Sequence, residues 1–153
     1  FAGVIFFGLM VNASGVYLLE YNMRFGDPET QAVLPLMQSE LLDAVQAALE
    51  RRLDDNAFRW QDAHACCVVA ASAGDPGEFR TGLPITGLER ARFHGLVFIA
   101  GAKQECGEMQ TSGGRVLNCV GVAPTASEAR QQAYDAIAQV QFDGITWRRD
   151  IGQ

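Results

Sequence analysis

The chain has 153 residues and a mass of 16.6 kDa, with 48% hydrophobic and 20% charged residues, a composition typical of a globular protein. Twelve basic and eighteen acidic residues give a formal net charge of −6, which argues against a general attraction to nucleic-acid backbones. No run approaches the roughly 20 apolar residues that a membrane-spanning helix needs, so neither nucleic acid nor membrane is an expected partner.

The first 25 residues have the pattern of a β-hairpin. Phe1–Met10 is apolar and rich in β-forming residues, the run from Asn12 to Gly15 has turn chemistry, and Val16–Phe25 is a second strand candidate. An apolar start of this kind predicts that upstream sequence packs against it and that the chain begins partway through a larger protein.

A helix is predicted from an N-cap at Ser39 to about Leu53. Acidic residues in its first turn and basic residues in its last complement the helix dipole. Its apolar residues recur at helical spacing; they are Leu41, Leu42, Val45, Ala48, Leu49 and Leu53. The run Asp54-Asp55-Asn56 then breaks the pattern, and we expect a domain boundary there.

The remainder reads as strands and one further helix. Three strand candidates are Ala65–Ala71, Leu96–Ala102 and Arg115–Ala123, with a turn at 74–77 and a hairpin connection at 103–114. The capping-box pattern from Thr125 to Glu128 opens a helix. The expected apolar side of this helix comprises Ala129, Ala133, Ala136, Ile137 and Val140. The end of the chain is predicted to be irregular or a short strand, and the fold class is α+β.

The four cysteines predict free thiols. Cys66, Cys67, Cys106 and Cys119 include no C-x-x-C pair, which fits neither a zinc site nor a secreted disulfide framework. Buried or free thiols are typical of a reducing compartment, so we expect a cytoplasmic protein.

One face of the second predicted strand has polar side chains that are suited to binding a metal ion and an anion. Because strand side chains alternate, Val16, Leu18, Glu20, Asn22 and Arg24 are expected on a common face, with Glu20 and Asn22 about 7 Å apart at the backbone. Carboxylate and amide oxygens suit Mg²⁺, and a guanidinium suits a phosphate or carboxylate bound beside it. A solvated strand face with an incidental ion pair is the alternative.

The whole string from Leu19 to Gln31, LEYNMRFGDPETQ, closely resembles the signature of the phosphoribosylamine–glycine ligase family of the ATP-grasp superfamily. The likeness continues along the chain: 74–77 and 82–88 resemble the start of the family's C-terminal domain, and 97–101 and 111–117 resemble two of its later stretches. Ile99 stands where a His is expected, so no role is carried onto it.

The resemblance implies a fold, a domain division and an activity. Residues 1–55 would be the C-terminal portion of an ATP-grasp catalytic domain, built of antiparallel strands plus a helix, and 56–153 a small mixed α/β C-terminal domain. The full enzyme would use ATP to join phosphoribosylamine and glycine through glycyl phosphate, giving glycinamide ribonucleotide, ADP and phosphate in de novo purine biosynthesis. The family's upstream part would be missing, so this fragment alone is expected to be inactive.

The resemblance also implies site residues. Glu20 and Asn22 match the ligands of Mg²⁺ or Mn²⁺, with a further acidic ligand upstream, and Arg24 matches a catalytic residue facing the transferred phosphoryl group. Substrate-binding residues would be Asp27, Pro28 and Glu29, together with Gly113, Gly114 and Arg115. For the latter three, the alternative is a tight turn entering a strand, with Arg115 in a structural ion pair.

Two other functions stay open from the sequence. One is a different ATP-grasp carboxylate–amine ligase, which shares the E-x-N strand but not the R-F-G-D-P-E loop. The other is a non-catalytic binding module derived from the C-terminal region of the enzyme. An ATP lid and a glycine-rich nucleotide loop upstream would favour the ligase.

Overall fold

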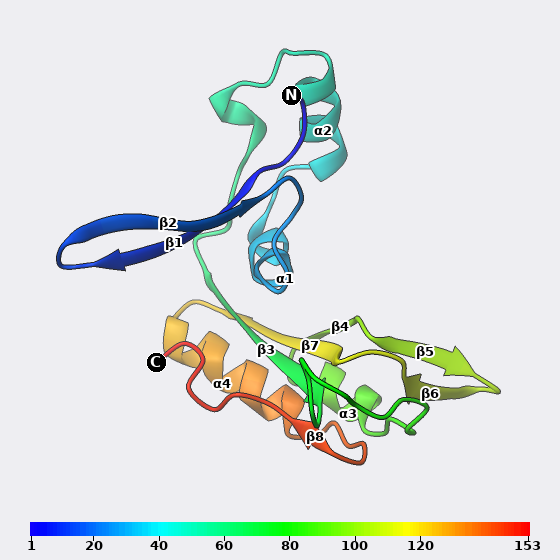
Figure 1. Cartoon of the computed structure of the whole chain (residues 1–153). Helices are drawn as coiled ribbons and strands as arrows, with labels where there is room; N and C mark the ends of the chain where they lie inside the picture. The colour runs from blue at the N-terminus through cyan, green and yellow to red at the C-terminus, as the bar shows by residue number, and fades with distance from the viewer. The chain divides into compact units, whose positions relative to one another are not determined.

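The computed structural model describes residues 1–153 and has the predicted α+β composition, with antiparallel strand pairs and few helices (Figure 1). The contacts divide the chain into two compact units: Phe1–Thr30 with Met37–Gln61, and Gln31–Leu36 with Asp62–Gln153. We call them the first and second unit. The division into domains 1–55 and 56–153 remains a prediction. None of the helices is long and apolar enough to cross a membrane.

The elements of the chain up to residue 61 are two strands, two α-helices and two short 3-10 helices. In chain order they are β1 (Phe6–Asn12), β2 (Gly15–Asn22), α1 (Glu29–Val33), η1 (Leu34–Leu36), α2 (Leu41–Leu49) and η2 (Asp55–Ala57).

The predicted hairpin is present, but it starts and ends differently. β1 and β2 pair antiparallel from Phe6 opposite Asn22 to Asn12 opposite Gly15, and the turn is closed by the Ser14 amide donating to Asn12 Oδ1 at 2.8 Å. The register shifts between Gly8 and Leu9, because Gly8 faces Glu20 while Leu9 faces Leu18. Leu19 is therefore the extra residue of a β-bulge.

The predicted cap of α2 is wrong. Ser39 was expected to cap the helix, but its hydroxyl accepts a hydrogen bond from the Arg59 amide at 3.1 Å, and Glu40 is the N-cap residue without a side-chain bond. The helix ends at Leu49 rather than near Leu53. Arg51 takes a left-handed conformation (φ 56°), and the amides of Arg51 and Arg52 bond back to Ala48 and Ala47, a Schellman termination.

The remaining elements belong to the second unit. They are β3 (His64–Ser72), α3 (Leu88–Arg92), β4 (Leu96–Ile99), β5 (Ala102–Glu105), β6 (Glu108–Thr111), β7 (Arg115–Ala123), α4 (Ala126–Ile137) and β8 (Ile145–Thr146).

An antiparallel four-stranded sheet of order β4-β7-β3-β8 forms the second unit, and α4 packs along it (Figure 1). Thr125 caps α4 as predicted, since its hydroxyl oxygen accepts from the Glu128 amide at 3.2 Å. The predicted apolar residues are all buried: Ala129, Ala133, Ala136 and Ile137 lie on α4 as predicted, whereas Val140 follows the helix, which ends at Ile137. They pack with β3 and β7 in one hydrophobic core.

The segment predicted as a single strand at 96–102 is two strands. β4 ends at Ile99, and after a break β5 pairs with β6 in a separate two-stranded ribbon, which the sequence had indicated only as a hairpin connection. Its turn contains Cys106 and Gly107, both with positive φ (50° and 85°). Gly107 adopts this conformation without a steric penalty, because glycine has no Cβ atom.

Candidate functional site

Glu20 and Asn22 lie on the same face of β2, as their spacing predicts. In the hairpin register they stand opposite Gly8 and Phe6, and residues that face each other across an antiparallel pair share a face. Gly8 leaves room for the acid: a Cβ atom at Gly8 would lie 3.2 Å from Glu20 Cγ. The Glu20 side chain is exposed and Asn22 is half-buried, so both donors are accessible.

The bulge corrects the predicted neighbours of this pair. Val16 and Leu18 face Val11 and Leu9, and these positions alternate with Gly8 and Phe6 along β1. They therefore lie on the face opposite Glu20 and Asn22, whereas Tyr17, paired with Met10, shares the face of the polar pair. The extra residue at Leu19 inverts the alternation, which a strict period of two cannot anticipate.

Arg24 does not continue the strand face. β2 ends at Asn22, because its partner strand begins at Phe6 and offers no pairing beyond that point. The Arg24 guanidinium instead donates from Nη1 to the Phe25 carbonyl oxygen at 2.8 Å, and its side chain is exposed. The expectation that Arg24 projects in line with Glu20 and Asn22 is therefore wrong for this structure.

The segment that follows β2 becomes helical at Glu29, where α1 begins. Gly26 is buried, and a Cβ atom there would lie 3.0 Å from Phe6 Cδ2 and 2.5 Å from Glu29 Oε2. The Glu29 carboxylate thus folds back over Gly26, while Thr30 donates from Oγ1 to the Gly26 carbonyl at 2.6 Å. Gly26 and Thr30 hold the turn that presents Asp27, Pro28 and Glu29, a role that the sequence reasoning missed.

Gly113 and Gly114 lie in the second unit, where close packing leaves little room for a side chain. The Gly113 amide donates to the Gly101 carbonyl at 3.0 Å, and a Cβ atom at Gly113 would lie 3.0 Å from Gly101 Cα. A Cβ atom at Gly114 would overlap the carboxylate of Asp75. Gly101 and Asp75 are thus partners that the sequence analysis did not connect to this turn.

Ser72 fixes the same turn from β3. Its amide donates to Gly114 O at 2.8 Å and its hydroxyl to Gly113 O at 3.1 Å. Arg115, the next residue, begins β7 and is exposed. The close packing supports the tight-turn alternative for the glycines.

The other side chains that could bind a metal ion or react are the histidines and the cysteines. No group of three or more His, Cys, Asp or Glu side chains is arranged to hold a metal ion, and both histidines, His64 and His94, are exposed. All four cysteines are free thiols. Burial raises the pKa of the Cys119 thiol to about 12 and also raises that of Cys66, where Arg130 opposes the effect.

Comparison with known proteins identifies the class. The family profile described as "Phosphoribosylglycinamide synthetase, ATP-grasp (A) domain" matches residues 1–30, and "Phosphoribosylglycinamide synthetase, C domain" matches residues 65–153. The second match covers more than half of the chain. The chain belongs to the phosphoribosylglycinamide synthetase family, and it spans a piece of the ATP-grasp domain followed by the C domain.

The relatives are named as phosphoribosylamine–glycine ligases or as purine biosynthetic proteins. A phosphoribosylamine–glycine ligase of Clostridium acetobutylicum is 51% identical over 153 residues, which is 100% of this chain and 36% of the relative. The trifunctional purine biosynthetic protein adenosine-3 of Gallus gallus is 42% identical over 99% of this chain and 15% of its own length.

A solved structure shows the same fold. The crystal structure of a phosphoribosylamine–glycine ligase from Thermotoga maritima superposes with a TM-score of 0.81 at 38% identity, covering 95% of this chain and 36% of that chain. The chain therefore spans a little over one third of the length of the ligases that it matches.

Proposed function

We propose that the chain is the C-terminal third of a phosphoribosylamine–glycine ligase. The whole enzyme would use ATP to phosphorylate the carboxylate of glycine, and the amine of phosphoribosylamine would attack the glycyl phosphate to give glycinamide ribonucleotide. The observation that carries the proposal is 51% identity along the entire chain, including the signature from Leu19 to Gln31. The four free thiols support a cytoplasmic location.

Glu20 and Asn22 would hold Mg²⁺ or Mn²⁺, with another acidic ligand from the upstream part. Their chemistry fits: both offer hard oxygen donors, on one strand face, with Gly8 opposite Glu20 leaving space. When bound, the ion offsets negative charge on the phosphates of ATP and on the transferred phosphoryl group. The preference between the two metals is left open.

The other residues would bind and orient substrates. The Arg24 guanidinium would leave the Phe25 carbonyl to face the transferred phosphoryl group, a small rearrangement for an exposed side chain. Asp27, Pro28 and Glu29 would contact glycine or phosphoribosylamine from the turn held by Gly26. Arg115 would bind a substrate phosphate, and Gly113 and Gly114 would present it. Such alignment supplies much of the rate in phosphoryl transfer.

The test uses a complete enzyme made by placing the chain after the upstream two thirds of the Clostridium acetobutylicum relative. We call this protein the chimera. The chimera should release ADP in a reaction that requires both glycine and phosphoribosylamine, while the 153-residue chain alone should release none. Glu20→Gln in the chimera should lower kcat at least ~10²-fold. The bound metal ion stabilises the charge of the transition state by several kcal/mol, and each ~1.36 kcal/mol of lost stabilisation lowers the rate tenfold.

One control and one companion variant make the result specific. Glu50→Gln changes an exposed acid at the end of α2, where it bonds only to Gln46 and Arg52, and should leave kcat near the parental value. Asn22→Ala should act in the same direction as Glu20→Gln. If Glu20→Gln keeps more than half of the parental kcat with an unchanged melting temperature, the metal assignment fails.

A further inference from the structure

The first unit has almost no core of its own. Its buried apolar side chains are Ala44 and Ala47, both small and both on α2. Large apolar side chains are exposed instead, for example Leu49 at 68%, Leu19 at 65% and Val45 at 40%. A unit that buries so little apolar surface is marginal by itself, and exposed apolar surface of this extent marks a place where another polypeptide packs.

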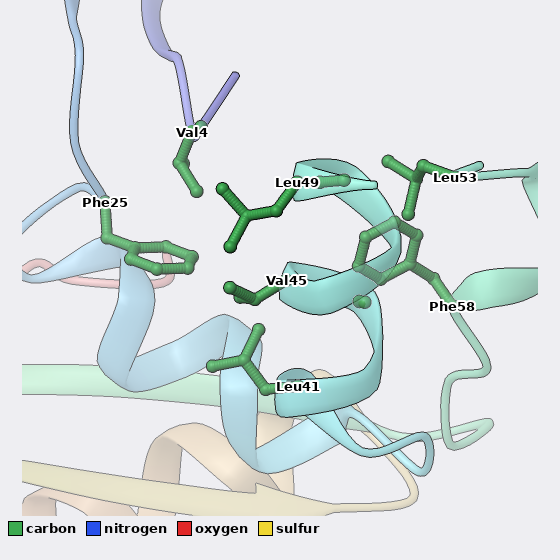
Figure 2. A pocket seen from close by; sticks show the side chains of 10 residues that line it. Val4, Phe25, Leu41, Val45, Leu49, Leu53 and Phe58 are labelled. Atoms are coloured by element: carbon green, nitrogen blue, oxygen red, sulfur yellow. The ribbon is translucent and has the colours of Figure 1, made fainter. Parts of the chain in front are cut away.

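This apolar surface includes one defined pocket of about 310 Å³. Val45 and Leu49 project into it from α2, facing Val4 and Phe25 on the segments that flank the hairpin, and Phe58 closes one end (Figure 2). All ten lining residues are apolar. Metabolite sites combine apolar walls with a few fixed polar groups, so the lining favours apolar side chains over a charged substrate.

The length of the relatives indicates where those side chains come from. The ligases that match the whole chain are almost three times as long, and the ATP-grasp profile matches only residues 1–30 here. Gly3 and Val4 are themselves part of the pocket wall. In a full-length ligase, the polypeptide preceding this region therefore emerges beside the pocket, at a high effective concentration that a second copy lacks.

We propose that the pocket receives apolar side chains from the upstream part of the same ligase polypeptide, so that α2 is completed by residues outside this chain. The inference rests on the proposed function only for the existence of that upstream part. It assigns α2 a role as a docking surface within the ATP-grasp domain, separate from the polar residues of the hairpin and the following turn.

The test measures access to the pocket by thiol labelling. Leu49→Cys is introduced with Cys106→Ser, which removes the exposed native thiol, in both the 153-residue chain and the chimera. Leu49→Cys should be labelled readily in the chain and at least about tenfold more slowly in the chimera, because labelling then requires local opening. The matched control is Gln46→Cys, on α2 but outside the pocket lining, which should be labelled at similar rates in both.

A second measurement tests the inference if the chimera does not fold. The chain and the upstream part are produced as two separate polypeptides, and co-purification should be lost with Leu49→Asp but kept with Gln46→Asp. Equal labelling of Leu49→Cys in both proteins, or undiminished co-purification of Leu49→Asp, overturns the inference. The alternative is that the chain associates with itself through the pocket. If Leu49→Asp abolishes that self-association and the upstream part does not displace it, the pocket binds a second copy, and the inference is overturned.

These readouts are independent of catalysis. An active chimera with an accessible pocket contradicts the docking inference alone. An inactive, folded chimera with a protected pocket contradicts the proposed function alone.

Discussion

Gly121 and Gly114 are both enclosed, but by different kinds of atom. A Cβ atom at Gly121 would overlap the Ala129 carbonyl oxygen and lie 2.8 Å from the Ala133 amide nitrogen, which are backbone atoms of α4. At Gly114 the closest atoms belong to the Asp75 carboxylate, the end of an exposed side chain that can turn away. The two glycines therefore offer a matched pair of substitutions.

Gly121→Ala should destabilise the second unit by about 3 kcal/mol, whereas Gly114→Ala should cost about 1–2 kcal/mol, because overpacking is costly when neighbours cannot move. Asp75→Ala combined with Gly114→Ala should recover part of the loss, which a double-mutant cycle detects. Urea unfolding followed by circular dichroism measures the free energies of unfolding of the parent, Gly121→Ala, Gly114→Ala, Asp75→Ala and the double variant. Equal losses at the two glycines would show that backbone contact is not the determining factor.

The buried thiols should differ from the exposed one in reactivity. The thiolate is the reactive form, and burial, which disfavours charge, raises the pKa of Cys119 to about 12. At pH 8 only about 10⁻⁴ of Cys119 would be thiolate, and at pH 10 still about 1%. We expect a maleimide to modify the exposed Cys106 first and Cys119 only after unfolding, as peptide mass spectrometry would show. Modification of Cys119 before Cys106 at pH 8 would contradict this.

At the scale of elements, the two longer helices show when a cap can be predicted. Thr125 and Glu128 lie three residues apart and bond to each other locally, so the capping box was visible in the sequence. Ser39 has the same chemistry, but its hydroxyl is taken by the amide of Arg59, twenty residues away. Local pattern therefore identifies a cap only where no distant partner competes.

Thr125→Ala should lower the stability of the second unit by about 1 kcal/mol, since it leaves the Glu128 amide without its side-chain acceptor. Ser127→Ala, an exposed change in the same first turn, is the control and should have little effect. Thermal unfolding of the three proteins measures the difference. A loss no larger for Thr125→Ala than for Ser127→Ala would mean that the cap contributes nothing measurable.

The strands show the same limit of prediction. The bounds of β3 and β7 were predicted to within one residue, because short runs composed mainly of apolar residues define both strands. The bulge at Leu19 was missed, since it depends on the pairing of Gly8 with Glu20 across the hairpin. Glu20, Asn22 and Arg24 were placed on one face by strand alternation, but the direction of Arg24 depends on where strand pairing stops, which the residue types do not encode.

At the scale of the whole molecule, the two units differ in how much of their hydrogen bonding is protected. β3, β7 and α4 surround a continuous core containing Val68, Leu117 and Ile137, all fully buried. β1 and β2 form a two-stranded hairpin whose large side chains are mostly exposed, and such a hairpin is marginally stable in water. Their backbone amides should therefore open at very different free energies.

Hydrogen exchange of the 153-residue chain should show this difference directly. Amides of β7 and α4 should exchange only on global unfolding, while those of β1, β2 and α2 should exchange faster by about two orders of magnitude or more, because local opening suffices. Mass spectrometry of peptides at neutral pH measures both sets in one sample. In the chimera, protection of β1, β2 and α2 should rise while β7 stays unchanged. Equal protection of β1 and β7 in the chain alone would show that the first unit is stable without a cover, and would remove the physical reason for upstream packing on it.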